Sequence, residues 1–128
     1  MRSIGTAVGV AALLTCSGIA SAQLRIANWN VTNYSGGRTA EFQTSLYGVV
    51  PATLALEGQR FAPDIILGEE FISQAAVDAF RNLLNTASGS PGDWASAPFI
   101  DGPDTDSAFF YRTSKVQYLQ TVIVSLVT

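Results

Sequence analysis

The stretch APDIILGEEF, residues 62–71, decides how this 128-residue sequence folds and where it carries chemistry. Its apolar run is typical of a buried strand, but the run ends in two adjacent carboxylates, Glu69 and Glu70. A protein core rejects such groups unless they are paired, solvated or bound to a cation. Adjacent residues of a strand point to opposite faces, so the two glutamates cannot form a facing catalytic pair. The stretch therefore predicts a strand that ends in one functional carboxylate.

The segments before this strand alternate between strand and helix patterns. Residues 24–31, LRIANWNV, have the two-residue period of a strand, and TNYSGGR, residues 32–38, follows as a predicted loop. Apolar residues then recur at helical spacing over residues 39–49. Pro51 either ends this helix or opens a second short helix that runs through residue 60. The order strand, helix, strand indicates a mixed α and β fold.

The segments after it begin with a helix and continue as short β-like pieces. Ser73 is the predicted N-cap of a helix over residues 74–87, whose apolar residues form one stripe. Strand-like pieces follow at residues 94–100, 107–112 and 116–128. The last piece is apolar up to the final residue, where a complete domain would more often have a polar tail. This pattern predicts a chain interrupted in the middle of a sheet.

The first 22 residues have the pattern of a signal peptide. Arg2 is followed by an apolar run and then by Ala20-Ser21-Ala22, which fits the small-x-small rule for signal peptidase. The unbroken apolar run has about 15 residues, fewer than the ~20 that a membrane-spanning helix needs. Lipid attachment at Cys16 is the alternative. We expect cleavage after Ala22, a secreted or periplasmic product and no stable membrane span.

The composition of residues 23–128 describes one folded, acidic domain. The whole chain is 48% hydrophobic and 13% charged, which excludes a disordered chain and an all-apolar membrane protein. The only cysteine precedes residue 23, so no disulfide can form within the domain. Ten acidic and six of the seven basic residues remain, and the net charge is 6 − 10 = −4. Non-specific nucleic-acid binding would therefore lack its usual electrostatic source.

Two of these motifs resemble those of the endonuclease/exonuclease/phosphatase superfamily, which includes deoxyribonuclease I, the abasic-site endonucleases and the neutral sphingomyelinases. LRIANWNV is similar to the family's first motif, L-R-I-A-x-W-N-V, and Asn30 takes the position of the metal-site amide. PDIILGEE, residues 63–70, is similar to P-D-I-I-x-L-Q-E, and Glu70 takes the position of the metal-binding glutamate. Glu69 replaces the usual glutamine and Gly68 the usual leucine. A weaker similarity covers DSAFFYRTSKV, residues 106–116, and carries no catalytic assignment.

The resemblance implies an α/β (α+β) fold, namely a four-layer α/β/β/α sandwich with two mixed sheets. Residues 23–128 would form only the N-terminal half of this sandwich, so the domain is expected to be truncated here. It also implies that Asn30 and Glu70 hold Mg²⁺ or Mn²⁺ for phosphodiester hydrolysis. Nucleic acid, phospholipid and phosphate monoester are all substrate classes of the family. Its histidine pair, Asp-x-Asn segment and final Asp-His come from the second half of the fold, and this chain contains no histidine. We therefore expect the fragment to be inactive alone.

Other interpretations of the same residues stay open at this point. A secreted, non-catalytic binding module on the same fold would contact a surface partner through Tyr34, Trp94 and neighbouring loops, because a fold does not establish an activity. Glu69 is expected to be solvated or to face a basic partner. Asn30 could also be a turn former, and it lies in one of two glycosylation sequons, the other at Asn33. Oxygen-only ligands favour Mg²⁺ over Zn²⁺.

Overall fold

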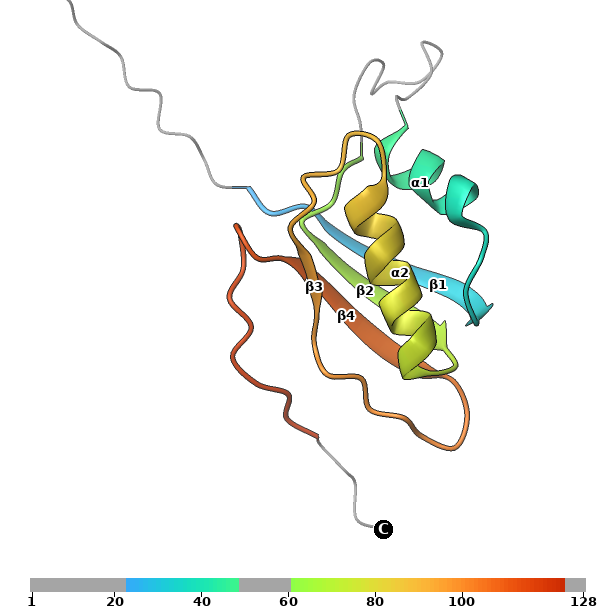
Figure 1. Cartoon of the computed structure of the whole chain (residues 1–128). Coiled ribbons are helices and arrows are strands. Elements are labelled where there is room, and N and C mark those ends of the chain that lie inside the picture. The colour runs from blue at the N-terminus through green and yellow to red at the C-terminus, as the bar shows by residue number, and fades with distance from the viewer. Residues whose placement is uncertain (1–22, 49–60, 124–128) are drawn as a thin grey trace, which may run out of the picture.

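The computed structural model describes residues 23–48 and 61–123, which form one mixed sheet with two helices (Figure 1). The elements in chain order are β1 (Ile26–Tyr34), α1 (Thr39–Tyr47), β2 (Ile65–Phe71), α2 (Gln74–Thr86), β3 (Trp94–Ser96) and β4 (Asp106–Arg112). The sheet order is β1-β2-β4-β3. β1 and β2 are parallel, and β4 runs antiparallel to both β2 and β3. The predicted α+β class with a mixed sheet is confirmed at this level.

Both helices pack on the same face of the sheet, around the ring of Phe80. This residue of α2 has no exposed surface, and its ring centroid lies 5.1–5.4 Å from four other aromatic rings: Tyr34, Phe42, Phe71 and Phe110. These four rings come from β1, α1, β2 and β4, so one side chain joins four elements. Ring pairs at this spacing add stability beyond the apolar area that they bury. The aromatic cluster is therefore the centre of the core.

The helix α2 forms as its sequence predicts. Its apolar stripe is buried, and the Ser73 hydroxyl oxygen accepts a hydrogen bond of 3.2 Å from the Ala76 N–H group. This contact satisfies one of the backbone donors that the first turn of a helix leaves free. Neither α1 nor α2 is long and apolar enough to cross a membrane, a finding that covers only residues 23–48 and 61–123.

The opposite face of the sheet is apolar and partly exposed. Ile26 is 60% exposed and Leu67 is 43% exposed. Phe109 pairs with Leu67 across β4 and β2, and its ring stacks with that of Tyr111 at 5.7 Å. Parallel strand pairs usually have both of their faces covered. Among the described residues, the sheet therefore has helices on one face and partly exposed apolar side chains on the other.

Several predicted element boundaries are wrong. β1 continues through Tyr34, where a loop was expected, because a bulge absorbs the turn-forming residues. α1 ends at Tyr47 rather than at residue 49, and β3 contains only three residues of the predicted 94–100 strand. Residues 116–123 form no strand, because no strand of the described chain pairs with them. Residues 124–128 and the second short helix expected before residue 60 lie outside the described residues.

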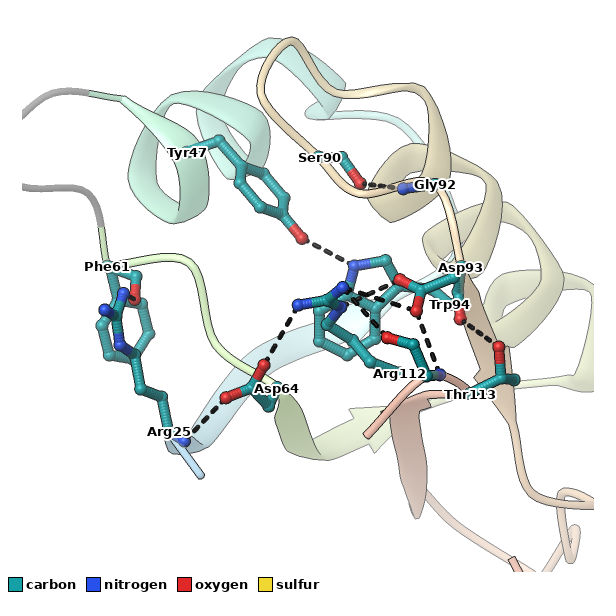
Figure 2. A network of polar contacts seen from close by, with 11 residues as sticks. Arg25, Tyr47, Phe61, Asp64, Ser90, Gly92, Asp93, Trp94, Arg112 and Thr113 are labelled. Carbon is teal, nitrogen blue, oxygen red and sulfur yellow. Dashed lines mark hydrogen bonds and ion pairs between the residues drawn. The ribbon is translucent and has the colours of Figure 1, made fainter. Parts of the chain in front are cut away.

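An ionic network ties together the end of the sheet at which β1 and β2 begin (Figure 2). The Asp64 carboxylate accepts hydrogen bonds from the Arg25 backbone N–H at 3.1 Å and from Arg112 Nη1 at 3.2 Å. Arg112 Nε also donates to Asp93 Oδ1 at 2.9 Å. The Asp64 side chain is only 8% exposed, and the paired guanidinium supplies the compensation that a buried carboxylate needs. The network thus joins β1, β2 and β4 without a covalent link.

Burial alone would raise the pKa of Asp93, but hydrogen bonds from Arg112 and Ser114 outweigh it and lower the pKa from 3.8 to about 2. A carboxyl group whose pKa is lower in the folded state stabilises the fold above its unfolded pKa. This stabilisation is lost as the pH falls from about 4 towards 2. We expect Asp93→Asn to lower the free energy of unfolding by about 1–2 kcal/mol at pH 6.

Urea denaturation of both proteins between pH 6 and pH 2.5 measures this difference. The gap between wild type and Asp93→Asn should narrow as the pH falls, because the wild-type carboxylate becomes protonated. A gap of constant size over this range would contradict an ionic role for Asp93.

Gly68 leaves room in the core for the ring of Phe71. A Cβ atom at position 68 would overlap Phe71 Cε2 and would lie 3.5 Å from Phe110 Cε2. Phe71 has no exposed surface and sits in the aromatic cluster, so its ring has little room to move. This contact gives a physical reason for glycine at position 68.

We therefore expect Gly68→Ala to lower the free energy of unfolding by about 1–3 kcal/mol, the usual cost of overpacking. Chemical denaturation measures the change. The double variant Gly68→Ala/Phe71→Leu is the control, because a smaller residue at 71 relieves the overlap. The two single changes should then be strongly non-additive. Additive losses would show that the strain does not arise from this contact.

Candidate functional site

The parallel pairing of β1 and β2 brings the two predicted site residues together. Asn30 lies opposite Glu69 in the strand register, one position before Glu70. Asn30 Nδ2 donates a hydrogen bond of 2.6 Å to Glu70 Oε1, although the residues are 40 positions apart in sequence. Parallel strands end at the same edge of a sheet, which is where open α/β sheets usually keep their sites. The structure thus joins both residues of the predicted metal site.

Both strands are irregular at this point. Asn30 pairs with Glu69 and Tyr34 pairs with Phe71, so three residues of β1 lie opposite the single residue Glu70. The backbone of Glu70 is left-handed, with a φ of 64°. Strand alternation alone would direct Glu70 to the face opposite Glu69, as expected from the sequence. The left-handed backbone instead turns the Glu70 carboxylate towards the end of β1.

The two oxygens of the Glu70 carboxylate have different partners. Oε1 accepts from the Asn30 amide, and Oε2 accepts from the Asn33 backbone N–H at 3.2 Å. The Asn30 side-chain oxygen accepts in turn from the Thr32 N–H at 2.9 Å. Each of these three oxygens has a further lone pair, because a carboxylate or amide oxygen carries two. The two oxygens of the Glu70 carboxylate and the Asn30 amide oxygen could therefore face a cation.

The surroundings of these oxygens leave them accessible to ions and water. Asn30 is exposed and Glu70 is half-buried. The Glu69 carboxylate makes no hydrogen bond or ion pair with the residues that the structure describes. In the same part of the chain, no three acidic, histidine or cysteine residues gather into a metal-binding group. Mg²⁺ bound here would complete its six oxygen ligands with water or substrate oxygens.

Asp106 is the carboxylate that the register places next to this edge, opposite Phe71. Its Oδ2 atom accepts a hydrogen bond of 2.6 Å from the Gly102 backbone N–H. The residue therefore closes the turn that leads into β4. We assign it a structural role.

The sequence did not reveal the backbone donors of Thr32 and Asn33. Both residues have left-handed φ angles, 55° and 49°, in a segment that the sequence predicted to be a loop. Asparagine is enriched in this conformation, which was the one available signal. Threonine is not, because its branched Cβ makes a left-handed backbone costly. The bulge therefore had no clear sequence signature.

The two aromatic residues expected to contact a surface partner are buried instead. Tyr34 is 3% exposed, and its hydroxyl donates to the Gly37 carbonyl oxygen at 3.2 Å. Trp94 is 4% exposed, and its Nε1–H donates to the Tyr47 hydroxyl at 2.6 Å (Figure 2). Both side chains have their polar atoms satisfied inside the molecule. The prediction that these two rings contact a surface partner is therefore wrong.

Comparison of the chain with protein-family models, with curated proteins and with solved structures found no significant match.

Replacing Asn30 with aspartate would test the contact with Glu70. The change removes a donor and places a second carboxylate next to Glu70, and like charges at this distance repel. Without divalent cations, we expect Asn30→Asp to lower the free energy of unfolding at pH 7 by about 1–2 kcal/mol. Asn30→Ala is the control, because it removes the donor without adding charge. Mg²⁺ should restore stability to Asn30→Asp but not to Asn30→Ala. Thermal melting with and without Mg²⁺ measures the change in stability of each variant. Equal changes in the two variants would contradict the contact between Asn30 and Glu70.

Proposed function

We propose that this chain is the N-terminal part of an exported phosphodiester hydrolase that depends on Mg²⁺ or Mn²⁺. The observation that carries the proposal is the hydrogen bond of 2.6 Å between Asn30 and Glu70. Each residue occupies the metal-site position of a separate motif, and nothing in the local sequence of either motif requires them to meet. Their contact at the common end of two parallel strands is the arrangement that a shared site needs.

Glu70 supplies the anionic oxygen of the proposed site, and Asn30 holds that carboxylate in place. A cation bound to these oxygens would polarise a phosphoryl oxygen and neutralise the charge that develops on it during hydrolysis. The exposed position of Asn30 leaves room for a phosphate group to approach. Residues that activate water or protonate the leaving oxygen would come from outside this chain's described residues.

A second contact supports the relation between the motifs. Asp64 belongs to the PDIILGEE motif, and Arg112 belongs to the segment 106–116, whose similarity to the same family is weaker. The two side chains form an ion pair of 3.2 Å in which both groups are largely buried. A residue of the weaker segment thus contacts a residue of the stronger motif. The ion pair gives the similarity of segment 106–116 a structural explanation, and we assign no catalytic role to this segment.

The exposed apolar face of the sheet supports a second layer of structure. Ile26, Leu67, Phe109 and Tyr111 line this face. A second sheet packed against it would bury these side chains and would produce the four-layer α/β/β/α sandwich that the motifs imply. We propose that this second sheet belongs to the remainder of the same domain.

Charge bears on the class of substrate. Residues 23–128 carry a net charge of 6 − 10 = −4, and an acidic surface weakens binding to nucleic acid. This half of the domain therefore offers no electrostatic support for a nucleic-acid substrate. Phospholipids and small phosphate esters suit it at least as well. The signal-like residues 1–22 favour a secreted or periplasmic enzyme.

A non-catalytic binding module remains the second candidate, now with a different surface. The exposed apolar face could receive a partner protein instead of a second sheet, because large apolar patches mark interaction sites. The sequence that follows Thr128 in the gene distinguishes the two candidates. Histidines and an Asp-x-Asn segment there would favour the hydrolase.

Substitutions at the adjacent glutamates test the proposed function in the complete natural protein. Glu70→Gln should lower the Mg²⁺- or Mn²⁺-dependent turnover by about 100-fold or more, because it removes the anionic ligand. Glu69→Gln, the matched control, should change turnover by less than about threefold. Hydrolysis of plasmid DNA and of bis(p-nitrophenyl) phosphate measures both effects. Equal losses of turnover from the two substitutions would show that Glu70 has no special role. Residues 23–128 alone should show no turnover.

A further inference from the structure

The bulge in β1 changes which residues of the strand face the core. Ala27 and Val31 are buried under the helices, and regular alternation would direct residue 33 to the same side. Tyr34 is buried there instead, with 3% exposure. The strand therefore reverses its alternation between Val31 and Tyr34.

The neighbouring strand β2 reverses its alternation at the same level. Ile66 and Gly68 face the helices, so regular alternation would direct Glu70 into the aromatic core. Phe71 occupies that side instead and has no exposed surface. The two irregularities compensate each other, because Tyr34 and Phe71 form one more pair after them, the last pair of the two strands. Matched reversals in two adjacent strands keep the Glu70 carboxylate out of the core.

The bulge also directs backbone donors towards the site. The Thr32 N–H group holds the Asn30 side-chain oxygen, and the Asn33 N–H group holds Glu70 Oε2. Left-handed backbone at non-glycine residues persists only where the surrounding structure maintains it, and it concentrates at functional sites. Here the buried residues Val31 and Tyr34 fix the two ends of the bulge.

We propose that Thr32 and Asn33 are positioning residues of the cation site and act through their backbone N–H groups. The bulge sets the direction of the Glu70 carboxylate. One lone pair of each Glu70 oxygen then accepts a hydrogen bond from the protein, and the other faces the cation. The side chains at positions 32 and 33 are free to vary, because the donors belong to the main chain. This inference rests on the proposed function, since it concerns the same cation site.

The role of the bulge is tested by measuring how tightly the complete natural protein binds Mn²⁺ alone. Water proton relaxation measures this affinity. Replacing Asn33 with its α-hydroxy analogue changes the amide into an ester and removes only the N–H group. We expect this ester to bind Mn²⁺ about 10- to 100-fold more weakly, the usual effect of losing a group that orients a ligand. Asn33→Gly is the matched control: it keeps the N–H group and tolerates the left-handed backbone, so its affinity should stay within about threefold of wild type.

A second variant removes residues 32 and 33 together, which leaves one residue of β1 opposite Glu70 and preserves the flanking registers. Circular dichroism and thermal melting establish whether it folds. If the deletion variant folds, it should lose Mn²⁺ binding. If it does not fold, the Mn²⁺ affinity of the ester variant alone tests the positioning role. Wild-type affinity in the ester, with Mn²⁺ binding lost in Glu70→Gln, would overturn the positioning role and leave the cation site intact. Absence of Mn²⁺ binding in the wild type would overturn the proposed site and this inference together.

Discussion

The parallel pairing of β1 with β2 is the constraint on which the rest of the structure depends. It aligns Asn30 with Glu69 at one end, and at the other end Asp64 accepts a hydrogen bond from the Arg25 backbone. A shift of one residue would move every side chain of one strand to the other face of the sheet. Tyr34 or Phe71, depending on the strand that shifts, would then leave the aromatic cluster, whose ring contacts join the helices to the sheet. The core and the candidate site therefore depend on the same register.

The sequence was sufficient for the features that depend on periodicity and order. The stripe of α2 and its Ser73 cap were predictable because both follow from residue spacing within a single segment. The meeting of Asn30 and Glu70 was predictable in outline, because the carboxyl ends of parallel strands lie at one edge. The partner of Arg112 was not predictable, because Asp64 is 48 residues away and no local pattern links the two residues.

The features that the sequence did not reveal arise from compensation between distant residues. Thr32 has an unfavourable backbone conformation that its own residue type does not predict, and only the packing of its neighbours explains it. Tyr34 and Trp94 were expected to contact a surface partner, yet Gly37 and Tyr47 satisfy their polar atoms inside the molecule. The apolar run at residues 116–123 resembles a strand, but strand structure also needs a partner.

The ionic network of Asp64, Arg112 and Asp93 lies at the opposite end of β2 from Glu70. The seven residues of β2 separate the two ends by about 20 Å, twice the distance beyond which substitutions usually act independently. Selection can therefore alter exposed residues near Glu70, such as Glu69 or Asn30, without disturbing this ionic anchor. This spatial separation gives the domain evolvability: descendants of such a chain can acquire a different chemistry, or lose theirs, and still inherit the same scaffold.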